Sequence, residues 1–323
     1  MKEFDFYLNK ILKLRRDNKN GGAPHKPILL LSLISNIESG LIKTNRINIT
    51  PELVSSFSKN WSNFVVGSHH HCVFALPFYH LRSSGFWTLE PKNGFELVVE
   101  SKIAMKTFSN LDTAINCAML DEELFVLLSD KISRDLIKSK IIEKYFPKAK
   151  TLKLNDGVKA ILKMETEVLS EPSVDYVLKV RGLELSLELE NFQEELFKRG
   201  AIFKRNIPKI YNNTCAISRL RVSTTFNASL IDACHIKPIS LSLDDTMTNG
   251  ISLTPTLHRA FDRGLISFNN HYEVIISTKY TESLESTYSI SQFEGTQILL
   301  PKESKYHPNL NGIKWHRENV FKP

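Results

Sequence analysis

The sequence predicts an α+β protein that mixes helices and strands in each of two domains. Helical spacing of apolar residues runs through the first part of the chain, for example over 3–16 and 51–64. Toward the other end, residues 232–262 show the order strand, loop, strand and helix, with polar residues at each junction. The length of 323 residues, 42% of them hydrophobic, suits two or three buried cores.

The first part of the chain is expected to be mainly helical. The helix at 3–16 has a basic end, and Pro27 should begin an apolar core helix. A third helix should cover about 51–64, followed by a strand from Trp87. Residues 105–146 are expected to be helical as well.

The charge changes sign along the chain, and its net value is +7. Residues 1–150 carry 21 Lys and Arg against 15 Asp and Glu, residues 151–200 carry 7 against 10, and residues 201–323 carry 14 against 10. We therefore expect a first domain at 1–150, an acidic connector at 151–200 and a second domain at 201–323. The connector should contain a strand or two and then a helix. Basic domains attract phosphate backbones, so both are candidates for contact with nucleic acid.

Membrane and secretory classes are not indicated. No apolar run approaches the ~18 residues of a membrane span, and the N-terminus lacks an apolar signal core. We therefore expect a cytoplasmic protein without a membrane partner. Four scattered cysteines indicate reduced thiols rather than a disulfide framework: Cys72, Cys117, Cys215 and Cys234.

Residues with catalytic chemistry concentrate between 232 and 262. A short apolar strand ends at His235, Asn249-Gly250 opens a second strand, and Thr254-Pro255 indicates the start of a helix that carries His258. Hydrolysis of a phosphodiester requires a base that activates water and a cation that stabilises charge on the phosphate. Histidines on a strand end and on the adjoining helix could supply both.

This pattern resembles the HNH nuclease family and its ββα-metal fold, with His235, Asn249 and His258 separated by 14 and 9 positions. The resemblance implies a metal-dependent DNA endonuclease in which His235 is the general base. It implies that the side chain of Asn249 holds the loop that orients this base. It also implies that His258 binds a divalent metal ion such as Mg²⁺ or Mn²⁺.

Two features depart from the family pattern. Many members have an Asp or His as a metal ligand directly before the base histidine, where this chain has Cys234. Asp232, on the same strand face, is the first choice for the second ligand, and Asp262, one helical turn after His258, is the next. Many members also bind structural zinc through two CxxC pairs. Because Cys215 has no such partner, no structural zinc is expected.

Two further segments, 23–27 and 76–87, together resemble the sulfur-binding domain of phosphorothioate-dependent, type IV-like restriction endonucleases. In that family an N-terminal domain reads DNA in which sulfur replaces a non-bridging phosphate oxygen, and a C-terminal HNH domain follows. The resemblance covers roughly residues 1–150 for the reader and 200–323 for the nuclease, in the same order. It predicts a DNA-reading domain followed by a ββα-metal nuclease domain.

Sulfur is larger, more polarizable and less strongly hydrated than oxygen. A selective site should therefore combine an apolar depression with cationic donors for the remaining charge. Family members often have an aromatic residue in place of Leu76 and an Asp in place of Ser84. The residues expected to form the depression are Leu76, Pro77, Phe78 and Tyr79, and the expected donors are His25, Lys26, His80 and Arg82.

Three functions remain open from the sequence. The first is a restriction endonuclease that reads phosphorothioate-modified DNA and hydrolyses phosphodiester bonds. The second is an HNH endonuclease that reads methylated or otherwise modified bases, because the aromatic residues of 72–87 could stack a flipped base. The third is a non-cutting DNA-binding module, to which only Cys234 points. The expected partner is double-stranded DNA, and the chain could act as a homodimer.

Overall fold

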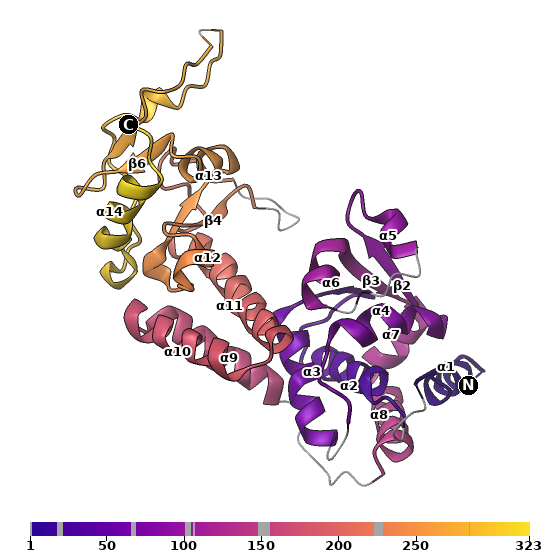
Figure 1. Ribbon diagram of the computed structural model, residues 1–323. Helices are drawn as coiled ribbons and strands as arrows, with labels where there is room; N and C mark the ends of the chain where they lie inside the picture. The colour runs from indigo at the N-terminus through magenta and orange to yellow at the C-terminus, as the bar shows by residue number, and fades with distance from the viewer. Residues whose placement is uncertain are drawn as a thin grey trace. The chain divides into compact units, whose positions relative to one another are not determined.

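The computed structural model describes residues 2–17, 22–65, 69–100, 105, 107–147, 156–222, 229–283 and 285–323. The chain forms two compact units (Figure 1). The N-terminal unit comprises Met1–Lys163 and Leu187–Lys198, and the C-terminal unit comprises Met164–Ser186 and Arg199–Pro323. The expected boundary at residue 150 lies outside the described residues, and the bounds at 150 and 200 remain a prediction.

The N-terminal unit surrounds a small sheet with helices. Its strands are β1 (Arg46–Asn48), β2 (Trp87–Pro91) and β3 (Ile115–Leu120). Its helices are α1 (Lys2–Leu12), α2 (His25–Glu38), α3 (Pro51–Phe64), α4 (Ala75–His80), the 3-10 helix η2 (Leu81–Ser84), α5 (Glu96–Glu100), α6 (Phe108–Ala114), α7 (Glu122–Ser129) and α8 (Lys131–Tyr145).

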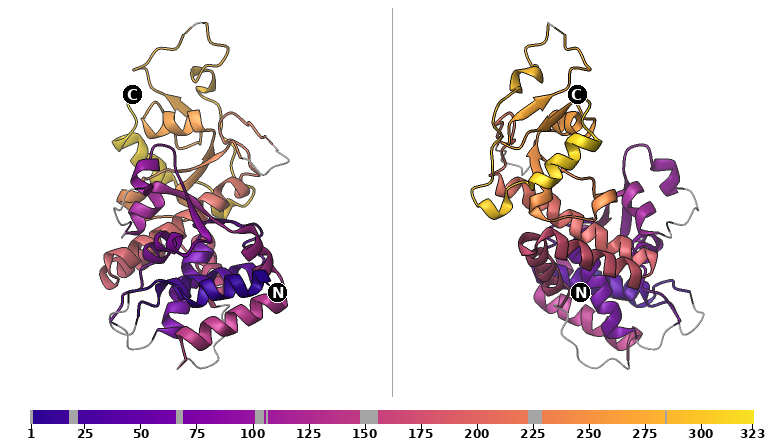
Figure 2. Two further views of the ribbon diagram at one scale, coloured as in Figure 1. Left: turned by 90° about the vertical axis from the view of Figure 1, so that its right-hand side faces the viewer. Right: turned by 60° about the vertical axis from the view of Figure 1, so that its left-hand side comes forward.

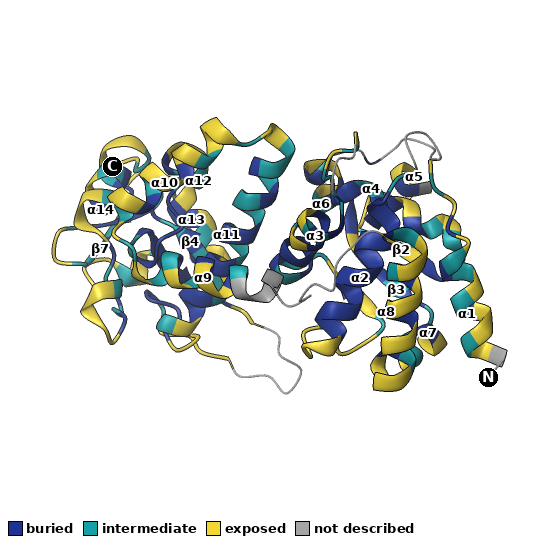
Figure 3. Cartoon of the chain, turned by 90° about the horizontal axis from the view of Figure 1, so that it is seen from below, coloured by how far each residue is buried: buried dark blue, intermediate teal, exposed yellow. Residues whose placement is uncertain are grey.

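Helix α2 is the centre of the N-terminal core. Its residues are apolar on every face, and nearly all are buried, as its dark blue ribbon shows in Figure 3. Two of its buried polar side chains are paired with α3: Asn36 donates to Ser56 Oγ at 2.9 Å, and Ser32 Oγ accepts from Asn60 at 3.0 Å. The apolar run therefore fixes the first turn of α2, with His25 and Lys26, against the rest of the unit.

The sheet corrects one prediction. Its order is β1-β3-β2, and β3 pairs antiparallel with both neighbours. Residues 105–146 were expected to be helical, but the central strand, Ile115–Leu120, lies between α6 and α7. This strand is buried at most positions, so its apolar run carries no alternation that distinguishes a strand from a helix.

The acidic connector is also different from the prediction. Between residues 156 and 200 the described chain contains only helix and turn: α9 (Asp156–Ser170), α10 (Ser173–Ser186) and the first part of α11 (Leu189–Ile210). The three helices lie next to one another (Figures 1 and 2). Glu167 of α9 forms ion pairs with Lys179 of α10 and with Arg199 of α11. Pro172 lies in the short turn between α9 and α10.

The C-terminal unit contains the predicted strand, strand and helix. Strand β4 (Asp232–His235) pairs antiparallel with β5 (Gly250–Leu253), with His235 opposite Gly250, and α13 (Pro255–Asp262) follows. The remaining elements are α12 (Ile239–Ser242), the 3-10 helices η3 (Met247–Asn249), η4 (Ser291–Phe293) and η5 (Ser304–Tyr306), the hairpin of β6 (Ile266–Phe268) and β7 (Val274–Ile276), and α14 (Leu310–Asn319).

Gly250 is required by a close approach of α11. A Cβ atom at this position would lie 2.1 Å from Ile207 Cδ1 and 2.8 Å from Phe203 Cε2. The glycine of the Asn-Gly pair therefore lets α11 pack directly on the start of β5. This packing places Phe203 beside His235.

Two further observations concern the whole chain. Among the described residues, no helix is both long and apolar enough to cross a lipid bilayer. The four cysteines are free thiols, and three of them are buried.

Candidate functional site

A cavity of about 320 Å³ opens at the end of β4 and beside α13. We call it the His235 cavity. Two of the three predicted HNH residues, His235 and His258, line it together with Asp262. The other lining residues are Ile236, Pro238, Ile239, Ser240, His316 and Val320.

The imidazole of His235 is fixed from two directions. Its ring stacks on Phe203, with centroids 3.8 Å apart and an interplanar angle of 6°. Its Nε2 lies 2.9 Å from Oδ1 of Asp245, which is 1% exposed. Because a carboxylate only accepts hydrogen bonds, Nε2 carries the hydrogen in the neutral ring. The lone pair of the neutral ring is therefore on Nδ1, the nitrogen that could take a proton.

Asn249 closes the loop between the two strands. Its Oδ1 accepts from the backbone N–H of Lys237 at 2.9 Å, and its Nδ2 donates to the carbonyls of Lys237 at 3.0 Å and Asp244 at 2.8 Å. The side chain is 5% exposed and does not line the cavity. It thereby holds the backbone on both sides of the loop that carries Asp245.

His258 lies between two carboxylates. Its Nδ1 is 3.3 Å from Asp232 Oδ2, and its Nε2 is 3.4 Å from Asp262 Oδ2. One potential ligand atom each from Cys234, His258 and Asp262 lies within 4.8 Å of the others. Asp232 is outside this group and contacts the opposite ring nitrogen. The geometry thus favours Asp262 beside His258, with Asp232 orienting the imidazole.

The group of Cys234, His258 and Asp262 has a donor set suited to a divalent metal ion. Sulfur and imidazole nitrogen favour first-row transition metals, whereas Mg²⁺ prefers oxygen ligands alone. Cys234 is fully buried, and burial, with Asp262 and Asp232 nearby, raises the pKa of its thiol well above the ordinary value. An ion held by this sulfur would therefore displace a proton.

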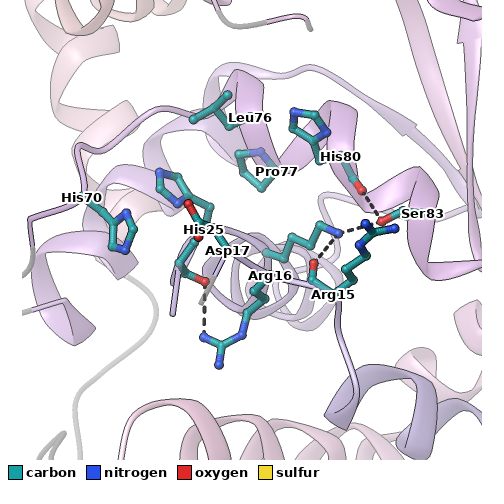
Figure 4. A pocket seen from close by; sticks show the side chains of 11 residues that line it. Arg15, Arg16, Asp17, His25, His70, Leu76, Pro77, His80 and Ser83 are labelled. Atoms are coloured by element: carbon teal, nitrogen blue, oxygen red, sulfur yellow. Dashed lines mark hydrogen bonds between the residues drawn. The ribbon is translucent and has the colours of Figure 1, made fainter. Parts of the chain in front are cut away.

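The N-terminal unit contains a larger cavity, of about 670 Å³, which we call the His25 cavity (Figure 4). The loop after α1, the first turn of α2, α4 and η2 all contribute to it. Figure 4 shows Leu76 and Pro77 on one side and Arg15 and Arg16 on the other. The residues that line it are Arg15, Arg16, Asp17, Ala23, His25, Lys26, His70, Leu76, Pro77, His80 and Ser83.

The structure brings together five of the eight residues predicted for sulfur binding: His25, Lys26, Leu76, Pro77 and His80. The other three lie elsewhere. Phe78 is fully buried in the core, and Tyr79 is 1% exposed. The guanidinium of Arg82 lies 3.9 Å from the Tyr79 ring centroid and donates to the carbonyl of Val99 at 2.5 Å. None of these three side chains lines the cavity.

Two of the three histidines that line the His25 cavity, His25 and His80, are not cationic donors, contrary to the expectation. Burial lowers the pKa of His25 to about 4, and its Nε2–H donates to the carbonyl of His71 at 2.9 Å. Burial, together with Lys26 and Arg82, also lowers the pKa of His80. At neutral pH both rings therefore present uncharged, polarizable surface.

Lys26 supplies a positive charge at the base of this cavity. Its Nζ donates to the carbonyl of Arg15 and to Ser83 Oγ, both at 2.8 Å. Burial and the charge of Arg15 lower its pKa to about 8, so it remains mostly protonated at pH 7. An anion that enters the cavity would meet this ammonium group and the first turn of α2.

Sequence reasoning missed several residues of these sites, among them Arg15, Arg16 and Asp245. Arg15 and Arg16 line the His25 cavity, and the basic end of the first helix was the available signal. Asp245 contacts His235, and its only signal was its place in the polar loop before Asn249. Neither the place of the two arginines in the cavity nor the contact of Asp245 with His235 could be inferred from spacing. Both depend on the path of the folded chain.

Comparison with protein families assigns each site to a domain. Residues 5–158 match the family described as "ScoMcrA-like, DNA sulfur-binding domain", and residues 215–269 match "HNH endonuclease". No curated protein matched the chain.

Several solved structures are similar over parts of the chain. The sulfur-binding domain of SprMcrA in complex with phosphorothioated DNA is 17% identical over 48% of this chain and 93% of that one, with a TM-score of 0.38. The type IV phosphorothioation-dependent restriction endonuclease ScoMcrA is 11% identical over 79% and 94%, with a TM-score of 0.33. The modification-dependent restriction endonuclease TagI is 16% identical over 37% and 38%, with a TM-score of 0.28. The chain thus spans well under half of TagI.

The two family matches indicate a DNA sulfur-binding domain followed by a nuclease domain. More particularly, the chain combines a ScoMcrA-like DNA sulfur-binding domain with an HNH endonuclease domain. The predicted resemblance and the predicted domain types are therefore confirmed.

Proposed function

We propose that this protein is an endonuclease that recognises phosphorothioate-modified DNA and hydrolyses its phosphodiester bonds. The observation that carries the proposal is the shared cavity of His235, His258 and Asp262 in the HNH domain. The candidate base and two members of the potential metal group line this one cavity, and hydrolysis of a phosphate ester requires both a base and a cation.

His235 is the general base of the proposed reaction. Asp245 keeps the hydrogen on Nε2, so Nδ1 takes the proton from the attacking water. The carboxylate then stabilises the imidazolium that forms. Phe203 restricts the tilt of the ring, and Asn249 fixes the loop that supplies Asp245. These contacts orient the base before the substrate arrives.

Cys234, His258 and Asp262 are the residues that would hold the metal ion. When bound, a divalent ion would stabilise negative charge on the phosphate. Asp232 contacts His258 Nδ1 and thereby directs Nε2 toward Asp262. Asp232 is thus a positioning residue in this proposal, although it remains the alternative ligand predicted from the sequence.

The His25 cavity is the proposed reader of sulfur. Leu76, Pro77 and the uncharged edges of His25 and His80 offer a surface on which a weakly hydrated sulfur atom loses little solvation and gains dispersion contact. Lys26 lies beside this surface and can pair with the remaining negative charge. An oxygen in the same place would lose stronger hydration, and this difference is the basis of discrimination.

Three matched plasmids test the proposal: unmodified, phosphorothioated and cytosine-methylated. With a divalent ion, the protein should cut only the phosphorothioated plasmid. His235→Ala should abolish cutting while DNA affinity stays within a few-fold, since the base acts in the transition state and not in docking. His271→Ala, an exposed histidine outside both cavities, is the matched control and should cut normally.

Each alternative has its own result in this experiment. Preferential cutting of the methylated plasmid would favour the modified-base reader. Binding without cutting of any plasmid, across several divalent ions, would favour the non-cutting module. Full activity of His235→Ala would overturn the HNH mechanism.

A further inference from the structure

A second cavity of about 370 Å³ adjoins the His25 cavity in the N-terminal unit. We call it the α1 groove. Arg15 and Ser83 line both cavities, so the two adjoin at these residues. The complete lining of the groove is Phe6, Asn9, Lys10, Lys13, Leu14, Arg15, Ser83 and Ser84.

The α1 groove is strongly basic. Lys10, Lys13 and Arg15 line it, and no acidic residue is among the described lining residues. Lys13 and Arg15 are exposed, and within the described chain neither takes part in an ion pair. Their charges are therefore available to an anion. Asn9, Ser83 and Ser84 add small polar side chains to the lining, and the Ser83 hydroxyl donates to the carbonyl of His80 at 3.0 Å.

The walls of the groove are held in place by the protein itself. Lys10 Nζ donates to the carbonyl of Gly85 at 2.8 Å and lies 4.4 Å from the Phe6 ring centroid, which ties α1 to the turn after η2. Lys26 holds the Arg15 carbonyl and Ser83 Oγ where the two cavities meet. The lysine that supplies charge to the His25 cavity thus also fixes the entrance to the groove.

We propose that the α1 groove binds the unmodified phosphate next to the sulfur-bearing linkage on the same DNA strand. This inference rests on the proposed function of the His25 cavity. Successive phosphates of one strand follow every ~3.4 Å along the duplex axis, so a basic cavity adjoining the sulfur site receives the neighbouring charge. The groove is not lined by Leu76 or Pro77, the apolar residues proposed to contact sulfur. It therefore contributes affinity and register, and the His25 cavity contributes discrimination.

Lys13→Ala is the central variant, because Lys13 is exposed and lines only the α1 groove. Its affinity is measured in the full-length, cleavage-blocked His235→Ala background with a phosphorothioated duplex and the same unmodified duplex. Both affinities should fall by the same factor, about three- to tenfold at low salt, and the slope of log affinity against log salt should decrease by about one. Lys59→Ala, an exposed lysine on α3 outside both cavities, should change neither quantity.

Replacing single phosphates by neutral methylphosphonates identifies the phosphate that Lys13 contacts. Each phosphate flanking the sulfur is replaced in turn, and at one position the parent protein should lose affinity by the factor that Lys13→Ala costs. Lys13→Ala should be insensitive to that replacement, so the two changes are not additive. The inference is overturned if no flanking position couples to Lys13, or if Lys13→Ala changes the ratio between the two duplexes. A ratio of one in the parent protein would instead remove the sulfur proposal and leave the phosphate contact measurable.

Discussion

Oδ1 of Asp245 lies 2.9 Å from Nε2 of His235, and the Asp245 side chain is almost wholly buried. The two residues are ten positions apart and are brought together by the loop that Asn249 closes. This contact selects the tautomer with its lone pair on Nδ1 and places a negative charge behind the ring. Asp245 is therefore the residue that orients the base and selects its tautomer.

Asp245→Asn should lower kcat for phosphorothioated DNA by about 10- to 100-fold, because the neutral amide no longer stabilises the imidazolium. KM and DNA affinity should change little, since Asp245 does not line the cavity. Single-turnover cleavage and a binding titration on the same variant separate the two effects. An unchanged kcat would remove Asp245 from the mechanism.

Asp262→Asn should raise the divalent-ion concentration needed for half-maximal cutting by at least about tenfold, and Asp232→Asn should raise it less. The physical reason is that Asp262, and not Asp232, shares the potential ligand group with Cys234 and His258. A metal titration of cleavage with both variants measures the difference. A larger increase for Asp232→Asn than for Asp262→Asn would identify Asp232 as the metal ligand, as the sequence suggested. Chelation should stop cutting in every active variant.

Affinity for DNA should decrease as the pH rises from 7 to 9. The pKa of Lys26 is lowered to about 8, so in the free protein its ammonium loses its proton, and its positive charge, within this range. If this charge is needed for binding, DNA affinity should be about tenfold lower at pH 9 than at pH 7. Lys26→Arg should bind equally well at both pH values, because arginine stays charged. An identical decrease in Lys26→Arg would show that another group titrates.

Leu76→Asn should reduce the preference for the phosphorothioated duplex and leave affinity for the unmodified duplex nearly constant. The polar amide must lose hydration when sulfur enters, and it offers less apolar contact. The measured quantity is the ratio of the two dissociation constants across a salt series. Leu136→Asn, at an exposed leucine of α8, is the matched control. A ratio that is the same in both variants would exclude Leu76 from the reading surface.

Local signals in the sequence located several elements closely. The helix expected at about 51–64 is Pro51–Phe64, where Thr50 accepts from the N–H of Leu53. Pro255 begins the helix that carries His258. Such signals work because capping, proline geometry and apolar spacing act within a few residues of one another. The segment at 115–120 was missed because a largely buried strand has no clear alternation of apolar and polar residues.

The sequence by itself determined the ββα order and the placement of His235 and His258 on adjoining elements, because these depend on short-range spacing. The domain types followed from the resemblance of its motifs to known families. Only the tertiary structure decided which side chains meet. It placed Asp245 and Phe203 against His235 and buried Phe78 and Tyr79 in the core. It also brought Arg15 and Ser83 to the lining of the same cavity. The reason is that packing and burial are properties of the folded chain. Which residues face one another across a cavity depends on how all the surrounding elements pack. Which residues are neighbours along a helix depends only on the helical backbone.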